Sequence, residues 1–162
     1  TTRRVRFDSR IAMPIRVGKA GAWQTIDYSK ENFVERVLAL TGGRKLPVVY
    51  DGVGKSTWEG SLDCIEPRGL MVSFGNASGA VTGVAIGILA QKGSLFLTRP
   101  TLATPIVPRA RLEASAEELF DLMIAGRIKV DIEQRYPLAE AARAHRDLEA
   151  RKTVGSTVLL PG

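Results

Sequence analysis

The stretch Arg68–Gly79, which reads Arg-Gly-Leu-Met-Val-Ser-Phe-Gly-Asn-Ala-Ser-Gly, decides the fold class. Its apolar run, Leu70–Phe74, is followed at once by small and polar residues. A strand buried in a parallel sheet has this pattern, because both faces are covered and turn residues follow its carboxyl end. Ligands of open α/β sheets bind beyond the carboxyl ends of the strands, so we expect Gly75–Gly79 to lie at a ligand-binding edge.

A second apolar run, Leu46–Tyr50, predicts another strand upstream. After it, Ser56–Glu59 has the spacing of a capping box, which predicts a helix that begins at Thr57. Pro67 and Gly69 are expected to close this helix. The three elements form a strand–helix–strand unit of the length expected for parallel strands.

The rest of the chain continues to alternate between strand and helix patterns, which indicates a parallel sheet. The further expected elements are a strand Trp23–Asp27, a helix Lys30–Thr41 capped by Ser29, a helix Ala85–Gln91, a strand Ser94–Leu97, a helix Ala116–Ile124, a strand Ile128–Ile132, a helix Ala139–Ala150 and a strand Thr157–Leu160. Residues 1–18 have a strand-like alternation, and both a paired strand and a loosely ordered extension remain open. Prolines cluster over Pro100–Pro108, where we expect a domain boundary.

The composition indicates a globular chain of 162 residues, with 44% hydrophobic and 25% charged residues and one core or two small ones. The single cysteine, Cys64, cannot form an internal disulfide and fits a reducing cytoplasm. The net charge of +6 is concentrated in residues 1–19, which hold six basic residues and one acidic residue. We favour a solvated basic head over an arm that binds a polyanion.

Several stretches together resemble the quinone oxidoreductases of the zinc-independent branch of the medium-chain dehydrogenase/reductase superfamily. The resemblance covers residues 18–162, and the stretches that carry it are Ala20–Tyr28, Val48–Gly54, Arg68–Gly79, Gly93–Pro100, Tyr136–Leu138, Ala144-His145 and Leu148–Arg151. It implies an α/β fold, namely an incomplete Rossmann-type parallel sheet with helices plus the carboxyl-terminal piece of a catalytic domain.

The resemblance also implies a division of the chain. Residues 1–19 form an unassigned basic head, residues 20–107 a partial dinucleotide-binding domain, and residues 108–162 the carboxyl-terminal part of the catalytic domain. In the family, a glycine-rich turn that holds the cofactor pyrophosphate precedes the segment matched at Ala20, and this chain shows no such turn. We therefore expect a truncated or rearranged member, or a fragment of a longer protein, that is weak or inactive alone.

The family residues that bind NADPH map onto this chain one by one. Tyr28 matches a residue beside the adenosine half and the 2′-phosphate, and a partly buried tyrosine at a strand end is an equal alternative. Phe74, Gly75 and Asn76 match the loop that passes the ribose and nicotinamide, and here we favour the functional interpretation.

The remaining matches are less specific. Phe96, Leu97 and Thr98 match the strand whose backbone meets the carboxamide, and the alternative is packing at a sheet edge. Arg151 matches an arginine that approaches the cofactor, and a solvated arginine at a helix end is an equal alternative.

Other reactive residues are more simply explained as structural. Asp51 is expected to cap a turn rather than to act as an acid or base. His145 lacks a second ligand or nucleophile, and Cys64 is expected to pack inside the protein. The sequence shows no metal-binding or Ser-His-Asp pattern and no catalytic residue is assigned, which fits hydride transfer carried out by a cofactor.

The first hypothesis is an NADPH-dependent quinone oxidoreductase that reduces a quinone or enone without zinc. It would be a cytoplasmic homodimer, away from membranes, that pairs through the Ser94–Leu97 edge strand. The alternative is a non-catalytic dimerising α/β module whose basic head binds RNA or another polyanion. A methyltransferase-like nucleotide-binding domain is a poorer third hypothesis, because it leaves the carboxyl-terminal segment unexplained.

Overall fold

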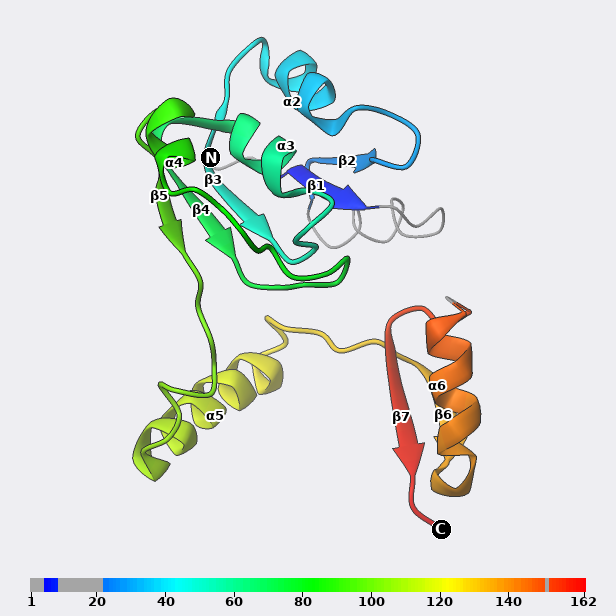
Figure 1. Ribbon diagram of the computed structural model, residues 1–162. Helices are drawn as coiled ribbons and strands as arrows, with labels where there is room; N and C mark the ends of the chain where they lie inside the picture. Colours follow the sequence, from blue (N-terminus) through cyan, green and yellow to red (C-terminus); the bar gives the residue numbers. More distant parts are fainter. Residues whose placement is uncertain (1–4, 9–21, 151) are drawn as a thin grey trace. The chain divides into compact units, whose positions relative to one another are not determined.

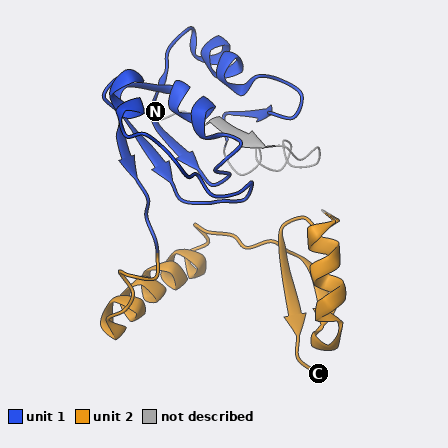
Figure 2. Ribbon diagram, in the orientation of Figure 1, with its two compact units in different colours: residues 1–101 blue, residues 102–162 orange. Residues whose placement is uncertain are grey.

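The computed structural model describes residues 5–8, 22–150 and 152–162. The chain forms two compact units, residues 1–101 (unit 1) and residues 102–162 (unit 2), which Figure 2 shows in different colours. The division falls within the proline-containing stretch 100–108. Whether these units correspond to the two domains of the family stays a prediction.

Unit 1 alternates between strands and short helices, and its strands are parallel (Figure 1). Its elements are β1 (Val5–Asp8), β2 (Gln24–Asp27), α2 (Phe33–Thr41), β3 (Leu46–Asp51), α3 (Trp58–Asp63), β4 (Ile65–Ser73), α4 (Gly87–Gln91) and β5 (Phe96–Thr98). β3, β4 and β5 form one sheet in that order, and β1 pairs with β2 in a second sheet. Parallel strands joined by helices confirm the predicted α/β class. Of the two alternatives left open for residues 1–18, the paired strand is confirmed for residues 5–8, which form β1.

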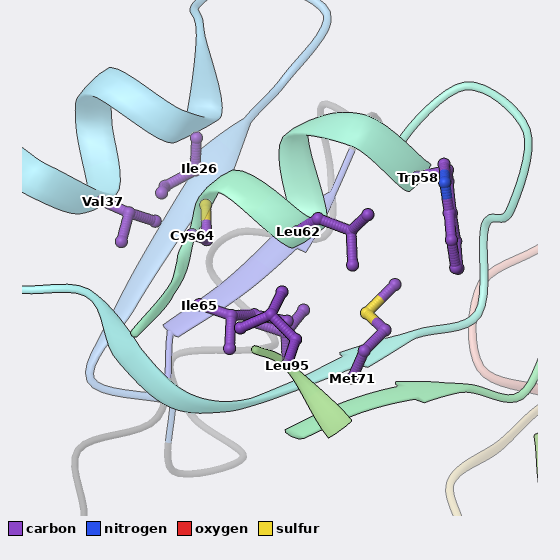
Figure 3. Close-up of a cluster of buried hydrophobic side chains, with 9 residues drawn as sticks. Ile26, Val37, Trp58, Leu62, Cys64, Ile65, Met71 and Leu95 are labelled. Atoms are coloured by element: carbon purple, nitrogen blue, oxygen red, sulfur yellow. The ribbon is translucent and has the colours of Figure 1, made fainter. Parts of the chain in front are cut away.

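The core of unit 1 lies where the helices pack on one face of the β3–β4–β5 sheet (Figure 3). Its buried members are Ile26, Val37, Val49, Trp58, Leu62, Cys64, Ile65, Met71 and Leu95. Along β3, Val49 points into this cluster while Val48 and Tyr50 on either side are exposed, as expected for the period of two in a strand. The structural role predicted for Cys64 agrees with its position inside the core.

The start of α2 differs from the prediction. The cap residue is Asn32, not Ser29, and its side-chain oxygen accepts from the backbone N–H groups of Val34 at 3.0 Å and Glu35 at 3.4 Å. Ser29 instead donates to the carboxylate of Asp27 within the turn that follows β2. The prediction was wrong because both residues are good caps and Ser29 is used by a nearer acceptor.

The boundary between α3 and β4 was also predicted wrongly. α3 ends at Asp63, and β4 begins at Ile65, so Pro67 and Gly69 lie in the strand and do not close a helix. Ile65 is fully buried and pairs with Leu46, and the register shifts beyond this pair. A Cβ on Gly69 would lie 2.9 Å from the Pro47 carbonyl oxygen, so the glycine allows the two strands to approach.

The strand β5 is displaced from its predicted position at Ser94–Leu97. It covers Phe96–Thr98, and Leu95 before it is buried in the core. All three residues of β5 are exposed, and β5 pairs with β4 at one end of the three-stranded sheet. The expected edge strand is therefore present, but Leu95 does not belong to it.

Unit 2 contains one long helix and a smaller parallel βαβ arrangement. Its elements are α5 (Arg109–Ile124), β6 (Ile132–Pro137), η1 (Leu138–Glu140), α6 (Ala141–Glu149) and β7 (Ser156–Leu160). The predicted strand Ile128–Ile132 is wrong, because pairing with β7 begins at Ile132 and continues to Pro137. β7 itself matches the prediction within one residue.

Candidate functional site at the carboxyl edge of the sheet

A buried carboxylate organises the turn after β3. Asp51 ends the strand and is 4% exposed. Its Oδ1 accepts from the backbone N–H groups of Val53 at 2.8 Å and Gly54 at 2.9 Å. Its Oδ2 accepts from the hydroxyl groups of Thr57 and Ser61, each at 2.8 Å. Because its two oxygens accept four hydrogen bonds, Asp51 shapes the turn and the start of α3. This agrees with the turn-capping role predicted for Asp51 from the sequence.

The turn after β3 lies against the loop after β4. We call residues 52–57 and 74–79 the edge loops, because both follow carboxyl ends of adjacent strands. The Phe74 N–H donates to the Asp51 carbonyl at 2.9 Å, and the Ser78 N–H donates to the Val53 carbonyl at 2.8 Å. The Lys55 N–H donates to the Gly79 carbonyl at 3.1 Å. Backbone hydrogen bonds therefore join the edge loops along their length.

Glycines make this close approach between the edge loops possible. A Cβ added to Gly75 would lie 2.2 Å from the carbonyl oxygen of Gly52, so no larger residue fits there. Gly54 has φ of +89°, and a Cβ on it would lie 2.7 Å from the Gly79 carbonyl oxygen. The positions of Gly52, Gly54 and Gly75 follow from contacts between two segments, which explains their spacing in the sequence.

Several predicted cofactor residues meet at this edge. Phe74 and Asn76 are exposed, and a Cβ on Gly52 would lie 3.0 Å from the Phe74 ring, so this ring lies over the first edge loop. The end of β5 is beside them, since Thr98 is the register partner of Val72 on β4. The structure thus brings Phe74–Asn76 near the end of Phe96–Thr98.

Tyr28 is not part of this grouping. Tyr28 is half-buried in the turn after β2, and its ring makes an edge contact with the ring of Phe33 at 6.4 Å between centroids. Asp27 next to it accepts hydrogen bonds from Ser29 and pairs with Lys30 at 3.2 Å, and these contacts lower the pKa of the Asp27 carboxyl. Arg151 lies outside the described residues.

The sequence interpretation missed Arg99, which follows β5 directly. Its Nη1 donates to the carbonyl oxygens of Ser73 at 2.9 Å and Gly75 at 3.2 Å, and to the Ser73 hydroxyl at 3.3 Å. A positively charged residue directly after a parallel strand was the available signal, because that position also lies at the ligand-binding edge. The sequence interpretation treated Thr98-Arg99-Pro100 only as the end of the strand.

A cavity of about 500 Å³ adjoins the first edge loop. Lys55 and Ser56 line it from the loop, Trp58 and Glu59 from α3, and residues 80–85 from the segment before α4. It offers both an apolar ring and charged side chains close to the glycine-rich backbone. The space near the edge loops is therefore large enough to receive part of a small molecule.

The described residues do not fit a metal ion. Within residues 22–150 and 152–162, no group of three or more His, Cys, Asp or Glu side chains could hold one. Burial raises the pKa of the Cys64 thiol to about 12, so this thiol is protonated at neutral pH. In the same part of the chain, no helix has both the length and the apolar character needed to cross a membrane.

Comparison with known proteins decides the family. The profile described as zinc-binding dehydrogenase matches residues 20–159. The chain belongs to the zinc-binding dehydrogenase family. Since the described residues of this member do not fit zinc, we derive no step of its chemistry from a metal ion.

Close relatives of this family member are quinone oxidoreductases. It is 65% identical over 141 residues to a quinone oxidoreductase of Pseudomonas aeruginosa, and 59% identical over 145 residues to quinone oxidoreductase 1 of Escherichia coli. These matches cover 87% and 88% of this chain, but only 43% and 44% of the relatives. The resemblance inferred from the sequence is confirmed, and the chain spans less than half the length of these curated relatives.

Solved structures agree with the sequence comparison. The crystal structure of Escherichia coli quinone oxidoreductase complexed with NADPH matches 98% of this chain with a TM-score of 0.90 and 53% identity. A mycobacterial structure complexed with NADPH matches with a TM-score of 0.88 and 43% identity. In both cases this chain covers 49% of the solved chain. These comparisons give no support to the RNA-binding alternative.

Proposed function

We propose that the chain forms part of the cofactor-binding region of an NADPH-dependent reductase that acts on quinones or related enones. The observation that carries the proposal is the pair of edge loops, where Gly52, Gly54 and Gly75 bring two backbones together at the carboxyl edge of a parallel sheet. Dinucleotides bind at this edge in open α/β sheets, and close relatives are quinone oxidoreductases.

The cofactor would contact exposed residues that surround the edge loops. Phe74, Gly75 and Asn76 would lie along its ribose and nicotinamide, and the backbone of Phe96–Thr98 would contact its carboxamide. Tyr28 would lie by the adenosine half, and the assignment of Arg151 to the cofactor rests on the family resemblance alone. NADPH, when bound, supplies the hydride for reduction.

The residues of this edge position a ligand and do not transfer protons. Asp51 is the carboxylate directly before the first edge loop in sequence, and its two oxygens already accept four hydrogen bonds. The exposed ring of Phe74 can exclude water from one side of a bound nicotinamide. A site whose residues bind and shield the cofactor fits a reaction in which the cofactor itself carries the chemistry.

A fluorescence titration of the full chain with NADPH tests the proposal. Trp58 is buried directly after the first edge loop, and Trp23 precedes β2, so both report on unit 1. Saturable quenching that is stronger with NADPH than with NADH, at two salt concentrations, supports the proposal. Quinone reduction is then measured with the same sample. Absence of saturation at millimolar NADPH contradicts the proposal.

The proposal includes a cytoplasmic homodimer that pairs through β5. Support comes from the position of β5 at one end of the three-stranded sheet and from the exposure of Phe96 and Leu97. An exposed apolar edge strand favours pairing with another strand. Phe96→Pro removes a backbone donor, and we expect a monomer by sedimentation, whereas Tyr50→Phe should leave the dimer unchanged. A dimer that survives Phe96→Pro contradicts this assignment.

A further inference from the structure

Arg99 lies where the carboxyl ends of β4 and β5 meet. It follows Thr98, the last residue of β5, whose register partner on β4 is Val72. β4 ends one residue later at Ser73, and the second edge loop begins there. The side chain of Arg99 therefore starts from one strand end and reaches the loop that leaves its neighbour.

The guanidinium group binds the first turn of that loop. Nη1 of Arg99 lies within hydrogen-bond distance of three oxygen atoms, the two carbonyl oxygens of Ser73 and Gly75 and the Ser73 hydroxyl. From the other side, the Phe74 N–H donates to the Asp51 carbonyl at 2.9 Å. Residues 73–75 are thus held from β3 by a backbone bond and from β5 by a charged side chain.

These contacts have two physical effects on the binding edge. Hydrogen bonds from a charged donor are stronger than neutral ones, so they restrict the loop at its first residues. The positive charge also offsets the negative ends of the carbonyl groups that face this edge, which would otherwise repel an anionic ligand.

The geometry points to Arg99 as a positioning residue that holds residues 73–75 in the conformation to which the nicotinamide half of NADPH binds. This inference rests on the proposed function. It assigns Arg99 no contact with the substrate and no step in the chemistry. Its effect on the cofactor is exerted through the loop and should be confined to the nicotinamide half of the molecule.

The test compares two ligands in the full chain. NADPH contains both halves of the cofactor, and adenosine 2′,5′-bisphosphate contains only the adenosine half. For Arg99→Ala we expect the dissociation constant of NADPH to rise about tenfold, which corresponds to the loss of one charged hydrogen bond. The dissociation constant of adenosine 2′,5′-bisphosphate should stay unchanged. Arg99→Lys should recover part of the affinity, and millimolar guanidinium ion should improve NADPH binding to Arg99→Ala.

Arg44→Ala is the matched control, since Arg44 is another exposed arginine of unit 1 that donates to a backbone carbonyl, that of Thr41. It should leave both dissociation constants unchanged. If wild type and Arg99→Ala bind NADPH with equal affinity, the inference is overturned and the proposed function is not. The same holds if Arg99→Ala weakens the binding of NADPH and of adenosine 2′,5′-bisphosphate equally, because the substitution then damages unit 1 as a whole. Failure of the wild-type chain to bind NADPH overturns the proposed function and the inference with it.

Discussion

In unit 1 nine apolar residues are buried in one cluster, whereas in the described part of unit 2 only Ala144 and Thr153 are buried. The helix α5 has no buried residue, and Leu119 and Phe120 on its predicted apolar face are exposed. In unit 2, β6 and α6 are joined by polar contacts, among them the hydrogen bond from Tyr136 to Asp147 at 3.1 Å.

This difference places the candidate site on the better-packed unit. The edge loops follow strands whose side chains are in the core, so their backbone positions are fixed by packing as well as by hydrogen bonds. The described part of unit 2 has several charged and polar pairs at its surface, and such pairs are weaker and depend on pH and salt. The two units should therefore respond differently to the same kind of substitution.

Equivalent truncations in the two units give the largest expected contrast. Leu62→Ala removes a fully buried side chain on α3 and should lower the free energy of unfolding by about 3 kcal/mol. Leu119→Ala makes the same change on α5, where the residue is 46% exposed, and should cost less than about 0.5 kcal/mol. Urea unfolding followed by circular dichroism measures both. Equal effects would show that α5 is packed as tightly as α3.

Removal of the Asp51 carboxylate should have the next largest effect. Asp51→Ala leaves four donors without their acceptor, and we expect a loss of about 2 to 3 kcal/mol in the free energy of unfolding. Hydrogen exchange should rise first at the Val53 and Gly54 amides. Asp51→Asn keeps one acceptor oxygen and should be less damaging. Unchanged exchange at both amides would show that the turn does not depend on this carboxylate.

A single methyl group at Gly75 tests the contact between the edge loops. Gly75→Ala places a Cβ against the Gly52 backbone and should cost about 2 kcal/mol, because neither backbone can move aside freely. NADPH affinity should fall with it. The control is Gly87→Ala in α4, where a Cβ meets nothing within 4 Å and stability should change by less than about 0.5 kcal/mol. Similar results for both variants would contradict the tight packing.

The strands of unit 1 could be predicted because their signal is local. Leu46–Tyr50 and Leu70–Phe74 are apolar runs with turn residues after them, and both form strands. β3 has nearly the predicted bounds, whereas β4 ends near the predicted residue but begins earlier, at Ile65. The helix boundaries were less accurate, since Ser29 and Asn32 are equally good caps and Gly69 serves a close strand contact.

The organisation of the candidate site could be predicted only in part. The position of Phe74–Asn76 at the ligand-binding edge could be predicted because these residues follow the end of a strand. Their role in binding the ribose and nicotinamide was inferred from the family resemblance. The contacts of Arg99 join segments that are distant in the sequence, so no local pattern reveals them. Such contacts become visible only when the register of neighbouring strands is known. The partners of Asp51 are near it in the sequence, which is why its role in the turn could be predicted.

The smallest expected effect is a pH dependence in unit 2. The hydrogen bond from Tyr136 and the pairing with Lys152 lower the pKa of the Asp147 carboxyl. Since the folded-state pKa lies below the unfolded-state value, this contribution to stability is present above about pH 4 and is lost as the pH falls through the folded-state pKa. Unit 2 should therefore lose stability below about pH 4 through a contact at its surface.

Tyr136→Phe removes the largest cause of that shift. Carbon NMR of the Asp147 carboxyl should show its pKa moving up toward the ordinary aspartate value of 3.8, and the acid-dependent loss of stability should shrink. Tyr50→Phe on unit 1 is the control, because Tyr50 is 71% exposed and distant in sequence from this pair. An unchanged Asp147 pKa in Tyr136→Phe would mean that Lys152 and Arg143 hold this carboxylate without the tyrosine, and that the hydrogen bond from Tyr136 on β6 to Asp147 on α6 contributes nothing to the shift.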